Sequence, residues 1–209
     1  MPAPFTIRSD ERILCSGKTG SGKTYLMRYL TKPLRRLVVL DGKGTLDNWD
    51  LVDLDRNSES LLFSDKPVRI RARLPEREEA PEAYWDSILM KCYQAGDVTI
   101  YIDELYAVAP PNQKVLPALW TVYTRGREFS VGVWASTQRP VWIPLVALSE
   151  AEAYIVFRLT LEEDRKRMAA FIGPTALNVI RDQHGFYFAR AEWDNPEYFQ
   201  KLVTRKAGD

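Results

Sequence analysis

Eight residues near the start of the chain, Gly17 to Thr24, follow the pattern Gly-x-x-x-x-Gly-Lys-Thr. A short apolar run precedes them, and a helical pattern from Tyr25 to Leu30 follows. A glycine-rich turn at a helix start leaves several backbone N–H groups free for phosphate oxygens. The pattern therefore predicts a nucleoside triphosphate site made by Gly17, Lys18, Thr19, Gly20, Ser21, Gly22, Lys23, Thr24 and Tyr25. The alternative is a chance match in a strand-to-helix turn.

Within this site two side chains have expected roles of their own. Lys23 is long enough to reach the β- and γ-phosphates, and the Thr24 hydroxyl can ligate Mg²⁺. The expected cofactors are therefore ATP and Mg²⁺.

Two adjacent acids, Asp103 and Glu104, end another apolar run. A carboxylate at that place can hold Mg²⁺ or its water beside a triphosphate. Neighbouring strand residues point to opposite faces, so the two acids are not expected to be duplicates. We assign the metal to Asp103 and the activation of an attacking water to Glu104. A solvated pair at a strand end is the alternative.

Three further polar residues are candidates for the same chemistry. Gln138 follows a strand expected to neighbour the phosphate-loop strand, and its amide could position the water or serve only to tie loops together. Arg125 and Arg127 end a predicted helix, where a guanidinium could act on the phosphoryl group of a neighbouring subunit. The helix dipole alone also favours arginine there. Arg139 is a weaker candidate.

Strands and helices alternate along the chain, which predicts the α/β class. Strands are expected at 11–16, 37–41, 68–74, 98–104, 131–135, 154–157 and 186–188, and helices at 23–30, 81–93, 112–124, 161–171 and 196–203. This pattern indicates an open, mainly parallel central sheet with helices on both faces. The carboxyl ends of its strands would bring residues 17–24, 103–104 and 136–139 to one edge. Three arginines alternate along 68–74, where a solvated sheet edge is expected.

Composition narrows the classes further. The 209 residues are 45% hydrophobic with a formal net charge of +1, so a single domain, 1–209, with an ordinary core is expected. No apolar run approaches the ~20 residues that span a bilayer, and the expected protein is soluble and intracellular. Cys15 and Cys92 match no metal spacing and are expected to be buried free thiols. His184 is expected to have a structural role.

Several of these segments together resemble the FtsK/HerA superfamily of DNA-pumping ATPases. They are 17–24, Leu40-Asp41-Gly42-Lys43-Gly44, Ile102-Asp103-Glu104, and Arg125-Gly126-Arg127 through Ala135-Ser136-Thr137-Gln138-Arg139-Pro140. The resemblance implies a P-loop NTPase of the additional-strand, catalytic-glutamate type. It also implies a homo-oligomeric ring, a pentamer or hexamer, that translocates double-stranded DNA. The family's arginine finger maps onto Arg125 or Arg127.

The compact core, without an added membrane or DNA-reading segment, looks most like the viral genome-packaging members. The expected function is therefore DNA packaging in the host cytoplasm or at a virion vertex, with capsid or vertex proteins as partners. Lys43 and Lys114 are candidate pore-lining residues, with solvated surface as the alternative. The other functions kept open are a HerA-like cellular or conjugative translocase, a small-molecule kinase, and a nucleotide-switched assembly module.

Overall fold

The computed structural model describes residues 7–76, 78–173, 187–192 and 195–201. Its strands are β1 (Arg12–Ser16), β2 (Arg36–Leu40), β3 (Val52–Asp53), β4 (Val68–Ala72), β5 (Val98–Ile102), β6 (Val131–Thr137), β7 (Ala153–Val156), β8 (Tyr187–Glu192) and β9 (Asn195–Lys201). Its helices are α1 (Lys23–Thr31), α2 (Arg56–Leu62), α3 (Pro81–Ala95), α4 (Leu105–Val108), α5 (Pro117–Arg125), α6 (Leu145–Ser149) and α7 (Glu162–Ile172), with 3₁₀ turns η1 (Gly126–Phe129) and η2 (Pro140–Trp142).

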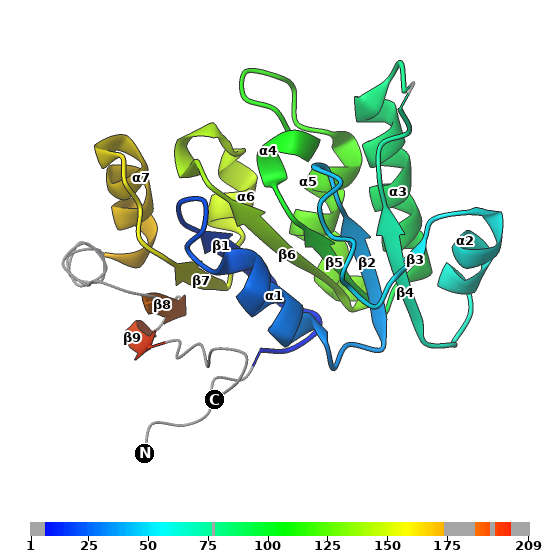
Figure 1. Ribbon diagram of the computed structural model, residues 1–209, viewed down its shortest axis with the longest axis horizontal. Coiled ribbons are helices and arrows are strands. Elements are labelled where there is room, and N and C mark those ends of the chain that lie inside the picture. The colour runs from blue at the N-terminus through cyan, green and yellow to red at the C-terminus, as the bar shows by residue number, and fades with distance from the viewer. Residues whose placement is uncertain (1–6, 77, 174–186, 193–194, 202–209) are drawn as a thin grey trace.

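Within the described ranges the strands form one sheet in the order β3-β4-β2-β5-β6-β1-β7-β8-β9 (Figure 1). The strands from β3 to β7 pair in parallel, and β8 and β9 add an antiparallel edge. The phosphate-loop strand β1 lies between β6 and β7, well inside the sheet. The predicted mainly parallel α/β sheet is confirmed.

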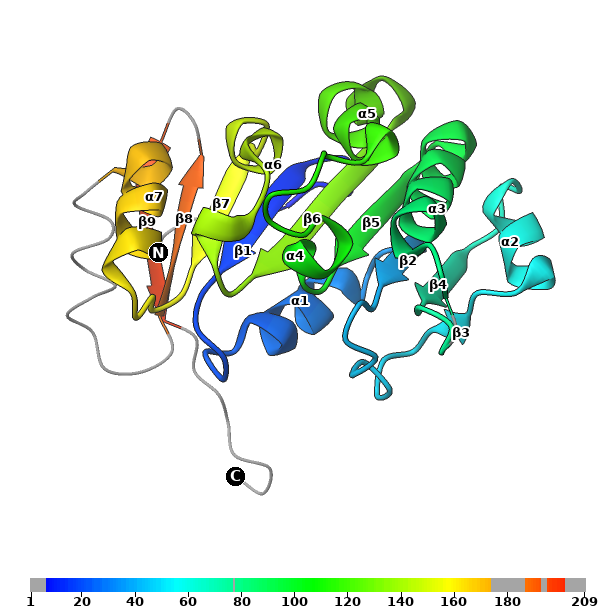
Figure 2. The same ribbon diagram turned by 90° about the horizontal axis from the view of Figure 1, so that it is seen from above.

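Two apolar layers, one on each face of the sheet, hold the fold together. Successive strand residues point to opposite faces, so Leu37 and Val39 of β2 pack with α1 while Val38 and Leu40 pack with α3 and α5. The two layers differ in the number of helices that cover them. Figure 2 shows α1 below the sheet and α3, α4, α5 and α6 above it. Helices therefore cover both faces, as predicted.

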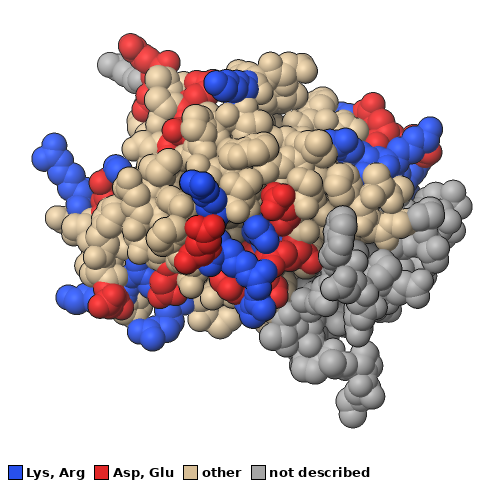
Figure 3. All heavy atoms as spheres, turned by 180° about the vertical axis from the view of Figure 1, so that it is seen from behind, with Lys and Arg blue, Asp and Glu red and all other residues tan. Residues whose placement is uncertain are grey.

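The surface agrees with the small net charge. Seen from behind, acidic and basic side chains mix over a wide uncharged area (Figure 3). Both cysteines are buried free thiols, as predicted. No helix in the described part of the chain is long and apolar enough to cross a membrane. That residues 1–209 make a single domain stays a prediction.

Two helix predictions were wrong. The segment 196–203 was expected to be helical, but Asn195–Lys201 is strand β9, paired with β8. Its Tyr198 and Phe199 favour a strand, and an available sheet edge outweighs the weak helical pattern. The helix expected at 112–124 begins only at Pro117, as α5, because Asn112 has a left-handed backbone (φ 64°) that no helix residue adopts.

The arginines of β4 do not form a solvated edge, and that prediction is also wrong. Strand β3 pairs with β4, and each arginine binds the segment that crosses beside it. Arg69 donates to Asp50 O at 3.1 Å, and also to the carbonyls of Thr31 and Leu34, at 2.9 and 2.8 Å. Arg71 donates to Leu46 O and to Asp53, both at 2.8 Å. The three guanidinium groups thus fix residues 41–53 on the sheet, with Arg73 on Asp41 at 3.1 Å.

We predict that Arg71→Leu lowers the free energy of unfolding by about 1–3 kcal/mol, because Leu46 O loses a buried donor. Urea unfolding measures this. The control Lys166→Leu removes a cation whose side chain is 76% exposed and should change stability by less than about 0.5 kcal/mol. Equal effects of the two substitutions would refute the anchoring role of Arg71.

Candidate active site

The turn between β1 and α1 has the shape that its glycines allow. Gly22, just before α1, has φ 100°, a backbone conformation that side chains with a Cβ rarely adopt. At Gly17 the limit is space, because a Cβ there would lie 2.5 Å from the Cβ of Phe157. Backbone bonds from Gly17 N to Thr137 O (3.2 Å) and from Lys18 N to Arg158 O (3.0 Å) tie the turn to the ends of β6 and β7.

Lys23 closes this turn from inside. Its Nζ donates to Gly17 O at 2.6 Å and to Lys18 O at 3.0 Å. Burial lowers the pKa of its ammonium, although nearby Glu104 and Asp103 act in the opposite direction. The hydroxyl of Ser21 is also buried and has no hydrogen-bond partner. The Lys23 ammonium has only neutral carbonyl acceptors, and the Ser21 hydroxyl has none. Both groups are therefore suited to bind phosphate oxygens.

The two acids after β5 lie in different surroundings, as expected from their alternation. Asp103 accepts a hydrogen bond from the Tyr101 hydroxyl at 2.9 Å, and that hydroxyl also lies 3.0 Å from Ser136 Oγ. Burial raises the pKa of Asp103. Glu104 is 1% exposed and is held by two other groups, Lys43 Nζ at 3.0 Å and the backbone N of Gln138 at 3.2 Å.

Gln138 lies where the sequence places it, just past β6, which neighbours β1. Its Oε1 accepts a hydrogen bond of 2.6 Å from Thr19 Oγ1 of the phosphate loop. Gln138 therefore joins the phosphate loop through its side chain and Glu104 through its backbone.

Sequence reasoning missed the role of Lys43, which it assigned to a pore or to solvated surface. The turn after β2 brings Lys43 to Glu104 and over the ring of Tyr106, 5.7 Å from its centroid. Burial alone would lower the pKa of Lys43, but the bond to Glu104 outweighs it and the pKa is raised. Asp41 shapes this turn by accepting from the backbone N–H groups of Thr45 and Leu46, at 3.0 and 3.1 Å. The signal available was the Asp-Gly-Lys-Gly run that ends a strand.

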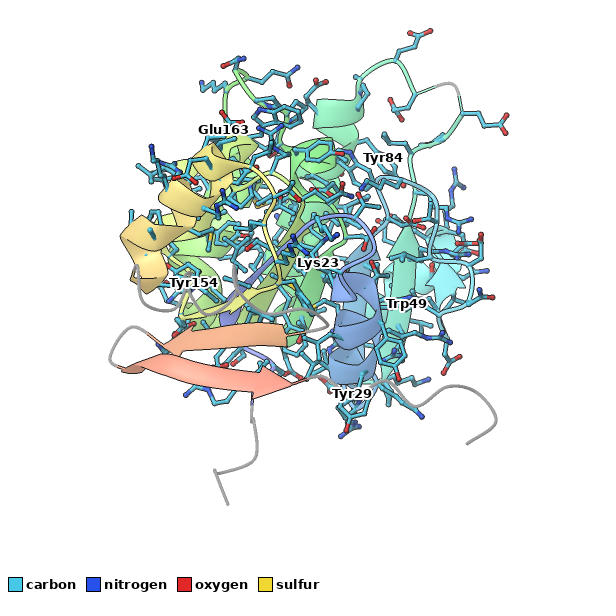
Figure 4. The ribbon with its side chains drawn as sticks, turned by 60° about the vertical axis from the view of Figure 1, so that its left-hand side comes forward. Lys23, Tyr29, Trp49, Tyr84, Tyr154 and Glu163 are labelled. Atoms are coloured by element: carbon cyan, nitrogen blue, oxygen red, sulfur yellow. The ribbon has the colours of Figure 1, made fainter. Side chains whose placement is uncertain are left out.

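These residues surround a cavity of about 390 Å³ at the carboxyl edge of the sheet, and Lys23 lies near the centre of the side chains in Figure 4. A hollow of about 650 Å³ beside Trp134 is larger but contains no acid, so we place the site by its chemistry. The cavity is lined by Thr19, Gly20, Ser21, Gly22, Lys23, Thr24, Tyr25, Lys43, Asp103, Glu104 and Gln138.

The candidate arginines lie elsewhere. Arg125 ends α5 and Arg127 lies in η1, just before β6, so both are at the amino edge, across the sheet from the phosphate loop. Arg127 pairs with Glu152 at 2.8 Å. Arg139 is close to the cavity, but its guanidinium binds Asp164 at 2.8 Å and also Glu163, and stacks on Trp142. No arginine lines the cavity within the described residues.

No protein-family model matches the chain. Over 172 residues it is 30% identical to the DNA packaging ATPase P9 of Enterobacteria phage PRD1. The matched region covers 78% of this chain and 70% of P9. The chain belongs to the DNA packaging ATPase family of P9.

Solved structures agree with this packaging ATPase fold. The genome packaging NTPase B204 of Sulfolobus turreted icosahedral virus 2, in complex with ATP-γS, superposes with a TM-score of 0.77 at 17% identity, covering 95% of this chain and 100% of B204. The B204 ATPase of Sulfolobus turreted icosahedral virus gives 0.74 at 19% identity, covering 93% and 98%. These identities establish the P-loop NTPase fold alone. The resemblance to viral packaging ATPases is confirmed by the relation to P9.

The residues of this packaging ATPase also fit a magnesium ion bound with a triphosphate. Thr24 and Asp103 both line the cavity. No group of three or more His, Cys, Asp or Glu side chains in the described ranges could hold a metal. Two protein ligands suffice for Mg²⁺, which keeps several waters and takes phosphate oxygens as further ligands.

We predict that Asp103→Asn stabilises the nucleotide-free protein at pH 7.5. The pKa of Asp103 is raised on folding, so its contribution to stability is full below the unfolded value of 3.8 and is lost as pH rises through the folded pKa. The asparagine cannot ionise and avoids that loss. Thermal melting should therefore show a stabilisation at pH 7.5 that shrinks as the pH approaches 3.8. A gain that persists undiminished at low pH, or an equal gain in exposed Asp50→Asn, would contradict this.

Proposed function

We propose that this chain is an ATP-hydrolysing motor that translocates double-stranded DNA and packages a viral genome into a capsid. The observation that carries the proposal is the single cavity that joins a phosphate loop, two differently held acids and Gln138. Membership of the P9 family favours packaging over a HerA-like cellular or conjugative translocase. Double-stranded DNA and capsid or vertex proteins are the proposed partners, in the host cytoplasm and at the virion vertex.

The phosphate loop and the start of α1 would bind the triphosphate. Free backbone N–H groups at the helix start, the Ser21 hydroxyl and the Lys23 ammonium are the donors available. Thr24 and Asp103 would hold Mg²⁺, which supplies charge neutralisation for the phosphate oxygens. The Tyr101 hydroxyl orients the Asp103 carboxylate.

Glu104 is the proposed general base for water, and Gln138 the group that positions the water. Both line the cavity. Glu104 is buried there, where a carboxylate interacts more strongly than it would in water, and Gln138 is half-buried. One Glu104 oxygen is occupied by Lys43 and the other by Gln138 N. The bond from Lys43 competes with a bond from water, so release of Glu104 by Lys43 would favour proton acceptance from that water.

The guanidinium group that offsets the charge of the transferring phosphoryl group would come from a neighbouring subunit. Arg125 or Arg127 is the proposed finger, and a ring of five or six copies is the proposed assembly. The cavity's lack of an arginine among the described residues supports this division.

The direct test is ATP turnover with and without linear double-stranded DNA. A motor should hydrolyse ATP faster when DNA is present. The proposal fails if the DNA neither binds nor changes turnover. Phosphoryl transfer to a nucleoside faster than hydrolysis would favour the small-molecule kinase. Tight ATP binding without turnover would favour the nucleotide-switched assembly module.

We predict that Glu104→Gln reduces ATP hydrolysis about 10²-fold or more, because a general base contributes that much. The nucleotide dissociation constant should change little, since the amide keeps the size of the carboxylate. Steady-state turnover and equilibrium binding of a fluorescent ATP analogue measure the two quantities. The exposed control Glu82→Gln should leave both unchanged. Undiminished turnover in Glu104→Gln would remove Glu104 from this role.

We predict that Lys43→Met raises turnover without DNA and brings the ratio of turnover with DNA to turnover without DNA closer to one. The reason is that the substitution removes the bond that occupies Glu104. Turnover of both proteins across DNA concentrations measures the ratio, with exposed Lys66→Met as the matched control. A loss of basal turnover in Lys43→Met would mean instead that the ammonium assists the reaction.

A further inference from the structure

We infer that two copies of this chain meet head to tail, with Trp120 of α5 on one copy seated in a hollow beside Tyr29 of α1 on the other. This inference rests on the proposed ring and names the two surfaces that would form it.

The first surface is a hollow of about 360 Å³ along the outer side of α1. Tyr25 and Tyr29, one helical turn apart, are 61% and 70% exposed and form one wall. Trp49, stacked on Tyr101 beneath, forms another, and Figure 4 shows Tyr29 and Trp49 on the same side of the molecule. The remaining lining residues are Arg28, Lys32, Asp50 and Arg69. Tyr25 also lines the nucleotide cavity, so the two sites adjoin.

The cations of this hollow favour an aromatic occupant over a nucleic-acid phosphate. Arg69 already donates to the carbonyls of Asp50, Thr31 and Leu34, at 3.1, 2.9 and 2.8 Å. Arg28 likewise donates to Asn48 O. Their charged planes remain available for stacking with an indole ring, while three of the five N–H donors of Arg69 are already used.

The second surface lies on α5, on the other face of the sheet. Trp120 is 55% exposed, although Leu119 beside it in sequence is fully buried. The hydroxyls of Thr121 and Thr124 bond to carbonyls of their own helix, Pro117 O and Trp120 O, both at 2.9 Å. Leu145 of the adjacent α6 is 58% exposed. The result is a largely uncharged surface on the face that Figure 3 views.

The two surfaces cannot meet within one chain, because α1 and α5 pack on opposite faces of the sheet (Figure 2). Each can meet the other surface on a second copy, and such a heterologous contact generates a ring when the rotation closes. A side chain as large as Trp, seated in a pocket, is the usual anchor of an interface.

The contact would also adjoin the active site. Tyr25, one helical turn from Tyr29, lines both this hollow and the nucleotide cavity. That cavity has no arginine of its own among the described residues.

Two single substitutions test this, Trp120→Asp and Tyr29→Asp, each placed on an exposed side chain that folding does not need. Association is measured by sedimentation with ATP-γS present. Each variant alone should associate about 30-fold more weakly than wild type or worse, as expected for the loss of an interface anchor. An equimolar mixture should form one-to-one dimers, because each variant keeps one intact surface. Phe63→Asp, at a similarly exposed aromatic residue, is the control and should associate as wild type does.

Three outcomes would overturn the inference: wild-type association of either variant, dimers formed by one variant alone, or no dimers in the mixture. Loss of DNA affinity in Tyr29→Asp with association unchanged would assign the hollow to nucleic acid instead. DNA-stimulated ATP turnover, measured on the same samples, separates the two proposals. If Trp120→Asp assembles and hydrolyses ATP as wild type does, the interface is wrong and the packaging function stands.

Discussion

Two carboxylates, those of Asp103 and Glu104, are buried side by side, and several elements of the fold compensate for their burial. Asp103 is 7% exposed and Glu104 1% exposed, and a charge taken out of water must be matched by nearby donors. The hydrogen-bond donors that compensate these two carboxylates come from different parts of the fold. Tyr101 bonds Asp103 from within β5, while Lys43 reaches Glu104 from the end of β2.

The position of Lys43 depends in turn on residues far along the chain. Asp41 forms the turn that carries Lys43, and Arg73 of the segment after β4 binds Asp41. Arg71 holds the next stretch at Leu46. Strands β3 and β4 and their arginines, at one edge of the sheet, thus help to position the residue that restrains the proposed general base.

The sequence allowed correct predictions where the signal is local. The turn from Gly17 to Thr24 needs glycine at Gly22 because of its backbone angle, so the motif predicts the geometry directly. Apolar runs predicted the parallel strands, since both of their faces are buried. The prediction failed where distant residues decide the outcome. Arg69 and Arg71 have the pattern of a solvated edge, and only the crossing of residues 41–53 makes them anchors. Residues 195–201 become a strand because β8 offers an edge.

Mixing two inactive variants tests whether the active site is shared between copies, as proposed. Glu104→Gln lacks the base, and Arg125→Ala with Arg127→Ala lacks both candidate fingers. In an equimolar mixture with linear double-stranded DNA, roughly a quarter of the sites would combine an intact base with a neighbour's intact arginine. ATP turnover should therefore recover toward that fraction of the wild-type rate. A mixture that assembles but stays as inactive as either variant alone would contradict it.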